Sequence, residues 1–139
     1  MKVKDVMHMG VEWVTPDSPL LGVARKMKKA DIGAIPVVEN DRLVGMVTDR
    51  DIVCNGLVQD GFDAGRATAR DVMTSGIHCC GEDDELDAAV KHMKRLRVRR
   101  LPVINKDKRM IGMLSLGDIG HSAGSDLISE CLRSVSAHH

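Results

Sequence analysis

Aromatic side chains are almost absent from this chain of 139 residues, which has one tryptophan, Trp13, one phenylalanine, Phe62, and no tyrosine. Proteins that bind single-stranded nucleic acids stack the bases on aromatic side chains, so no such platform is expected here. The chain also lacks an excess of charge, because 20 Lys and Arg balance 20 Asp and Glu. Nucleic-acid binding usually needs a basic excess, and the balance therefore disfavours a nucleic-acid partner.

Long apolar runs are missing as well. None approaches the roughly 20 residues that a membrane-spanning helix needs, and no apolar signal region follows residues 1–5. The four cysteines (Cys54, Cys79, Cys80 and Cys131) form no CxxC pair, which favours buried, reduced thiols. The sequence also lacks a P-loop, a nucleophile elbow and a GxGxxG motif. These absences predict a cytoplasmic, non-membrane protein without catalytic activity.

What the chain does contain is an internal repeat. A shift of 66 residues matches residues 5–7 with 71–73 and Pro36 with Pro102, and after one inserted residue a shift of 67 matches Gly45 with Gly112. Each copy is too short to bury a good core alone, so we expect the two to pack together about a pseudo-twofold axis. The predicted division is repeat 1 at 1–60, a linker at 61–70, repeat 2 at 71–120 and a helical tail at 121–139.

Each copy is predicted to follow the order β-α-β-β-α, which gives an α+β fold. In the first copy we expect a strand over 11–15, a helix capped by Ser18 with Pro19 as its first residue, strands over 35–38 and 43–48, and a helix over 49–58. Cys79 and Cys80 are expected in the first strand of the second copy. The tail spaces its apolar residues as an amphipathic helix does.

The chemistry is predicted where the last strand of each copy meets the helix after it. Thr48 and Asp51 stand there in the first copy, and Ser115 and Asp118 stand at the same spacing in the second. A carboxylate at this position can accept two hydrogen bonds from a cis-diol such as a ribose. The alternative is a plain helix capping box. Because the hydroxyl, the acid and an upstream proline all occur twice, a pair of binding sites is favoured.

These motifs resemble the cystathionine-β-synthase (CBS) domain family, as a stand-alone tandem pair. The residues that carry the resemblance are 5–7, 31–37 and 45–52 in the first copy and 71–74, 98–103 and 112–119 in the second. The resemblance implies two clefts between the repeats that bind adenosine compounds, namely AMP, ADP, ATP, S-adenosylmethionine or NAD. It also implies a disc-like homodimer.

Carried over by motif, the resemblance implies one set of ligand contacts in each copy. The first copy would contribute Thr15, Ile32, Gly33, Ala34, Ile35, Pro36, Thr48, Arg50 and Asp51. The second would contribute Cys80, Val98, Arg99, Arg100, Leu101, Pro102, Ser115 and Asp118. The second copy departs from the first, since Arg99 and Arg100 replace Gly33 and Ala34, and Gly81 replaces Thr15. The first copy is therefore ranked as the better-defined site.

The expected role is an adenosine-nucleotide sensor that signals energy or redox state to an unidentified protein partner. Two alternatives stay open. The module could be a ligand-free scaffold that docks a partner through its tail and the basic segment 91–100. It could also be a thiol or metal sensor built on His78, Cys79 and Cys80.

Overall fold

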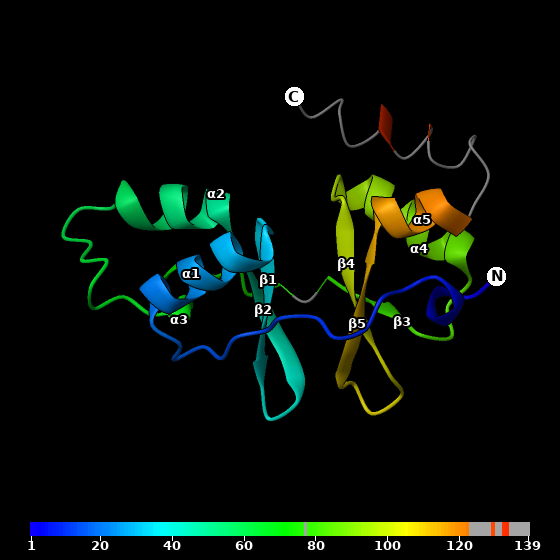
Figure 1. Cartoon of the computed structure of the whole chain (residues 1–139), viewed down its shortest axis with the longest axis horizontal. Coiled ribbons are helices and arrows are strands. Elements are labelled where there is room, and N and C mark those ends of the chain that lie inside the picture. Colours follow the sequence, from blue (N-terminus) through cyan, green and yellow to red (C-terminus); the bar gives the residue numbers. More distant parts are fainter. Residues whose placement is uncertain (77, 123–128, 130–131, 134–139) are drawn as a thin grey trace. The chain divides into compact units, whose positions relative to one another are not determined.

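The structure is a computed structural model that describes residues 1–76, 78–122, 129 and 132–133. The chain divides into two compact units, one formed by Glu12–Ile77 and the other by Met1–Val11 together with His78–His139. Each unit mixes helices with a small sheet (Figure 1), so the predicted α+β class is confirmed. The predicted tail helix, over 121–139, lies almost wholly outside the described residues. None of the helices in the described part is long and apolar enough to cross a membrane.

The contiguous unit is built around a β-hairpin. Its elements are α1 (Leu20–Ala30), β1 (Ala34–Glu39), β2 (Arg42–Thr48), α2 (Asp49–Asp51), a π-helical segment η2 (Ile52–Leu57) and α3 (Ala69–Val72). Strands β1 and β2 are antiparallel. They are joined by Asn40 and Asp41, whose φ angles of 53° and 65° fit the left-handed conformation that a tight hairpin requires. Leu20, Val23 and Met27 are the buried residues of α1.

The second unit repeats this plan with an added strand. Its elements are η1 (Val3–Asp5), β3 (Cys80–Gly81), α4 (Leu86–Leu96), β4 (Arg100–Ile104), β5 (Met110–Ser115) and α5 (Leu116–Ser122). β4 is the central strand, parallel to β3 and antiparallel to β5. Both long helices end on a residue in the left-handed conformation, Asp31 at φ 55° and Arg97 at φ 57°. The two long helices therefore end in the same way.

Each unit contains a short segment that belongs to the other copy in sequence, an arrangement called here the exchange of segments. The stretch around η1 belongs to the first copy in sequence, yet it bonds to the second copy, with Val3 N donating to Asp84 O and Lys4 N to Glu82 O, both at 3.0 Å. Beyond it, His8 and Met113 exchange two backbone hydrogen bonds of 3.0 Å. The segment of the second copy that contains Thr74 pairs in the same way with the first copy. Thr74 and Met46, on β2, exchange two backbone hydrogen bonds of 2.9 and 3.1 Å.

The exchanged segments approach their strands at glycines. A Cβ atom on Gly112 would lie 2.7 Å from the carbonyl oxygen of His8, and one on Gly45 would lie 2.6 Å from that of Thr74. Atoms at these distances overlap, so both positions require the absence of a side chain. The two glycines that define the repeat are therefore the points at which the exchange occurs.

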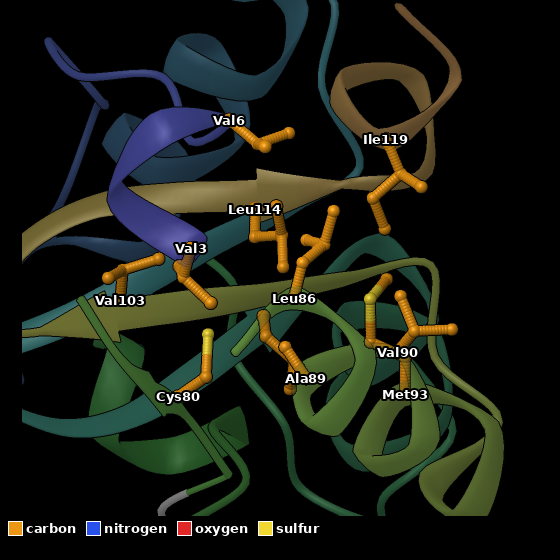
Figure 2. Packing of buried hydrophobic residues seen from close by; sticks show 11 residues of the cluster. Val3, Val6, Cys80, Leu86, Ala89, Val90, Met93, Val103, Leu114 and Ile119 are labelled. Atoms are coloured by element: carbon orange, nitrogen blue, oxygen red, sulfur yellow. The ribbon is translucent and has the colours of Figure 1, made fainter. Parts of the chain in front are cut away.

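Each unit has its own apolar core. The core of the unit with η1 joins residues from η1, β3, α4, β4, β5 and α5 (Figure 2), namely Val3, Val6, Cys80, Leu86, Ala89, Val90, Met93, Leu101, Val103, Leu114 and Ile119. The other core contains Val14, Leu20, Val23, Met27, Ile35, Val37, Val47, Ala67, Ala69 and Val72. Fully burying a side chain of this size contributes about 1.5–3 kcal/mol, so these cores hold the two hairpins in place.

Some local predictions are wrong. Helix α1 begins at Leu20 with Pro19 as its N-cap and no side-chain cap, because Ser18 Oγ accepts a hydrogen bond from Thr15 N at 3.0 Å instead. The strand expected over 11–15 is reduced to a single bridge between Val14 and Val37. Cys79 lies outside β3, which begins at Cys80. The helix expected over 49–58 is present but changes to a π-helix after Asp51.

Candidate functional site

The first candidate site lies at the junction of β2 and α2. Thr48 Oγ1 accepts a hydrogen bond from Asp51 N at 3.0 Å, and Asp51 Oδ2 accepts one from Thr48 N at 2.9 Å. These reciprocal bonds form a complete capping box. The capping interpretation is therefore true of this pair, and any ligand must use the acceptor capacity that the box leaves over. That capacity lies on Oδ1 of Asp51.

Two further side chains reach the same oxygen. Asn55 Nδ2 donates to Asp51 Oδ1 at 3.2 Å, and Thr74 Oγ1 donates to it at 3.3 Å. Asn55 also donates to the carbonyl of Val72 at 3.2 Å, so it links η2 to α3. Both bonds to Oδ1 are long for their type and involve exposed side chains. A bound diol would replace or share these two donors on Asp51.

The second candidate site, at the junction of β5 and α5, repeats the box. Ser115 Oγ accepts from Asp118 N at 3.1 Å, and Asp118 Oδ2 accepts from Ser115 N at 2.9 Å. His8 joins this site, with its Nδ1 2.8 Å from the same Oδ2. Because a carboxylate only accepts, His8 Nδ1 carries the hydrogen. Oδ1 of Asp118 is left without a hydrogen-bond partner among the described residues, so it is the more accessible acceptor of the two sites.

His8, Thr74 and Asn55 are not among the ligand contacts predicted from the sequence, although Thr74 belongs to the motif 71–74 that carries the resemblance. His8 and Thr74 occupy matching positions, 66 residues apart and directly after the matched segments 5–7 and 71–73. The repeat itself therefore contained the signal for these two residues. Recognising it required the exchange of segments between the units, which brings His8 to Asp118 and Thr74 to Asp51. Asn55 follows Asp51 by four residues, at helical spacing.

The remaining predicted contacts differ in exposure. The side chains of Ile35, Pro36, Leu101 and Pro102 are buried, Thr15, Arg50 and Arg99 are exposed, and Ile32, Gly33, Ala34, Val98 and Arg100 are intermediate. Cys80 is 5% exposed and lies in the core, where its Sγ donates to Pro102 O at 3.8 Å. The buried side chains among these residues are occupied with core packing, so only the backbone at these positions is available to a ligand.

Strand register places Arg100 beside the hydroxyl of its site. Arg100 is paired with Ser115, and Ala34 is paired with Thr48 at the matching position. Directly paired residues project from the same face of a sheet, with Cβ atoms about 4.5–5.5 Å apart. The first site is therefore open at Ala34, where the second has a long cationic side chain.

A shallow hollow of about 560 Å³ lies next to the first site in the contiguous unit. It is lined by Asn55, Gln59, Asp60, Gly61, Phe62, Asp63, Arg66, Ala67 and Asp71. Asn55 both lines this hollow and donates a hydrogen bond to Asp51. None of the contacts predicted from the sequence lines it.

Among the described residues, no group of three or more His, Cys, Asp or Glu side chains is placed to hold a metal ion. Burial raises the pKa of the Cys80 thiol to about 12, and burial also raises that of Cys79. Burial and the neighbouring Arg95 lower the pKa of His92. The rings of His78 and His92 have centroids 6.5 Å apart.

The two units each carry a hydroxyl residue and an aspartate where the hairpin meets the following helix, Thr48 with Asp51 and Ser115 with Asp118. This agrees with the tandem pair that the CBS resemblance predicts. The model of the CBS domain family matches residues 3–55 and 69–121. The chain belongs to the CBS domain family, and the resemblance drawn from the sequence is confirmed.

Its relatives include stand-alone proteins of the same size. Hypoxic response protein 1 of Mycobacterium tuberculosis is 33% identical over 133 residues, which are 95% of this chain and 92% of that protein. The CBS domain-containing protein YhcV of Bacillus subtilis is 36% identical and covers 90% of this chain and 91% of its own. A crystal structure of Hypoxic Response Protein I with two coordinated zinc ions superposes with a TM-score of 0.80 at 34% identity, over 89% of this chain and all of that one.

Enzymes also contain this module. The inosine-5'-monophosphate dehydrogenase of Methanocaldococcus jannaschii is 34% identical over 85% of this chain, but the match spans only 23% of the enzyme. The similarity therefore concerns the CBS part of that protein, and it carries no catalytic residues over to this chain.

Proposed function

We propose that this chain is a non-catalytic, cytoplasmic regulatory module that binds adenosine nucleotides and signals their level to a protein partner. The observation that carries the proposal is the duplicated box, in which Thr48 with Asp51 and Ser115 with Asp118 reproduce each other within 0.1 Å. A capping box needs only one carboxylate oxygen. The second oxygen of each aspartate supplies an acceptor for a ribose hydroxyl, as the family resemblance implies.

Related structures support an adenosine ligand. CBSX2 was crystallised in complex with AMP and superposes with a TM-score of 0.76. The CBS pair of protein MJ0100 was crystallised with 5'-methylthioadenosine and S-adenosylmethionine and superposes with a TM-score of 0.74. Their identities to this chain are 23% and 24%, so they support the fold and the class of ligand that we propose, and leave the choice among AMP, ADP, ATP, NAD and S-adenosylmethionine to experiment.

The proposed signal is a change in association with a second copy or another protein. Val53, Leu57 and Val58 project an apolar surface that is 48–66% exposed. They lie directly after Asp51, on η2 or next to it. Because Asn55 of the same segment bonds to Asp51, a ligand that displaces Asn55 would alter the segment that presents this surface. We propose that the apolar surface of Val53, Leu57 and Val58 forms a homodimer contact.

The test is isothermal titration of nucleotide-free protein with each of the five adenosine compounds. Asp51→Ala should weaken binding at the first site by the value of a charge-assisted hydrogen bond, about 1.5–3 kcal/mol, or roughly 10- to 150-fold. Asp118→Ala should do the same at the second site. Asp71→Ala is the matched control, because Asp71 completes a third box with Thr68 at 2.8 Å and forms no hydrogen bond to Asp51 or Asp118 in the described part of the chain, although it lines the hollow beside the first site.

Loss of binding in the two site variants, with Asp71→Ala unchanged, would support the proposal. Unchanged nucleotide affinity in the double variant of Asp51 and Asp118 would refute the ribose assignment. If wild-type protein binds none of the compounds, the module is a scaffold instead.

A further inference from the structure

The two candidate sites have the same backbone but opposite charge. In the first unit, positions 31, 33, 34 and 49–51 carry three acids, Asp31, Asp49 and Asp51, and one arginine, Arg50. The six matching positions of the second unit, 97, 99, 100 and 116–118, carry three arginines, Arg97, Arg99 and Arg100, and one acid, Asp118. The structure supports the match between positions 31 and 97, because Asp31 and Arg97 are the C-cap residues of the equivalent helices α1 and α4 and both adopt the left-handed conformation.

In the first site the carboxylate of Asp49 lies next to Gly33, the residue before strand β1. Asp49 N donates to Gly33 O at 2.9 Å, and a Cβ on Gly33 would lie 3.0 Å from Asp49 Oδ2. The carboxylate of Asp49 therefore lies directly over the backbone of Gly33. Arg50 is exposed, and the carboxylates of Asp49 and Asp51 on either side in sequence offset its charge.

In the second site the same backbone contact is made without the acid. Leu116 N donates to Arg99 O at 3.0 Å, so Leu116 stands where Asp49 stands and Arg99 where Gly33 stands. Arg100 is paired across the sheet with Ser115. Among the described residues, neither Arg99 nor Arg100 forms an ion pair or a side-chain hydrogen bond. Arg100, on the face of the sheet that carries Ser115, is thus available to an anion beside the proposed ribose site.

Arginine side chains match phosphate oxygens in geometry and charge, whereas a carboxylate repels them. We infer that the two sites select different adenosine compounds. The site of Ser115 and Asp118 takes a nucleotide that carries phosphate, and the site of Thr48 and Asp51 takes an adenosine compound that carries none. This inference rests on the proposed function, and it reverses the ranking drawn from the sequence for phosphate-bearing ligands.

The test compares AMP with adenosine, which share base and ribose and differ only in the phosphate. Asp51→Ala protein binds mainly through the second site and Asp118→Ala protein mainly through the first, because each change weakens the altered site roughly 10- to 150-fold. Both carboxylates are also changed to Asn, which keeps an acceptor for the capped backbone amide if the alanine variants fold poorly. Isothermal titration of the full-length chain measures the four dissociation constants.

At the second site we expect AMP to bind at least about tenfold more tightly than adenosine, the value of one charge-assisted hydrogen bond. Arg100→Ala should remove most of this preference, and raising the salt concentration should weaken it. Arg109→Ala is the matched control, because it removes the same charge at the opposite, turn end of the β4–β5 hairpin. At the first site adenosine should bind at least as tightly as AMP, and Asp49→Leu should improve AMP binding several-fold.

An equal ratio of AMP to adenosine affinity at the two sites would overturn the inference and leave the proposed function standing. So would an AMP preference at the second site that Arg100→Ala and Arg109→Ala reduce equally. Failure of both compounds to bind wild-type protein would instead overturn the proposed function and, with it, the inference.

Discussion

Gly112→Ala tests the exchange of segments on which the second site depends. The added methyl group would lie 2.7 Å from the carbonyl oxygen of His8 and 3.2 Å from the sulfur of Met7. An ordinary contact begins near 3.4 Å. The backbone of the exchanged segment must therefore move away from β5, and the oxygen that moves is the one that accepts the hydrogen bond from Met113 N at 3.0 Å.

The magnitude follows from three terms. Forcing one extra methyl group into a packed contact costs about 1–3 kcal/mol. Weakening one backbone hydrogen bond costs up to about 1 kcal/mol. Replacing glycine by alanine in a strand returns about 0.5–1 kcal/mol of backbone entropy. We expect a net loss of about 1–3 kcal/mol in the free energy of unfolding.

Urea denaturation followed by circular dichroism measures this loss. Gly22→Ala is the matched control, because nothing lies within 4 Å of its Cβ position in α1, and alanine should stabilise that helix by up to about 1 kcal/mol. Gly45→Ala should resemble Gly112→Ala, since its methyl group would meet the Thr74 carbonyl at 2.6 Å. If Gly112→Ala is as stable as the wild type while Gly22→Ala is stabilised, the close approach of His8 to β5 is refuted.

Three further predictions concern the cores and their titrating groups. Leu101→Ala, at a position that is 1% exposed, should lower the free energy of unfolding by about 2–5 kcal/mol, whereas Leu57→Ala, at 61% exposed, should change it little; equal effects in urea denaturation would contradict the core assignment. Iodoacetamide at pH 8 should label the exposed Cys54 rapidly and leave Cys80 unlabelled in peptide maps, because burial raises the pKa of the Cys80 thiol to about 12. Fast labelling of Cys80 in folded protein would exclude its place in the core. Burial and Arg95 lower the pKa of His92 from its ordinary 6.5, so the unfolded chain takes up this proton first, and stability should fall as the pH drops below 6.5. His92→Leu should make the dependence of unfolding free energy on pH shallower between pH 6.5 and 5, and an unchanged slope would count against this assignment.

Much of the fold could be predicted from the sequence because its signals are local. Asn40 and Asp41 mark a tight hairpin turn, and the spacing of Thr48 and Asp51 marks a capping box whatever the surroundings. Ser18 misled the prediction, since its hydroxyl had two possible partners and bonds to Thr15 N rather than to the helix. The sequence alone could not supply that choice.

The site was only partly predictable for a different reason. Asp51 and Asp118 are recognised by their neighbours in sequence, but the residues that bond to them come from 23 and 110 positions away, respectively Thr74 and His8. Such partners are determined by the pairing of distant segments, His8 with Met113 on β5 and Thr74 with Met46 on β2. The replacement of the uncharged Gly33 and Ala34 by Arg99 and Arg100 in the second copy was visible in the sequence. Its meaning required the register that sets Arg100 opposite Ser115.

The exchange of segments also fixes an order of events during synthesis. The unit Glu12–Ile77 is contiguous and can complete its core soon after its last residue leaves the ribosome. The first eleven residues must wait for strand β5, about 100 residues later, which at bacterial or eukaryotic rates takes roughly 5–20 s. Throughout that interval Val3 and Val6, 0% and 8% exposed in the finished unit, have no core to enter. Throughout this interval a chaperone, or a neighbouring nascent copy, has the opportunity to capture the segment 1–11.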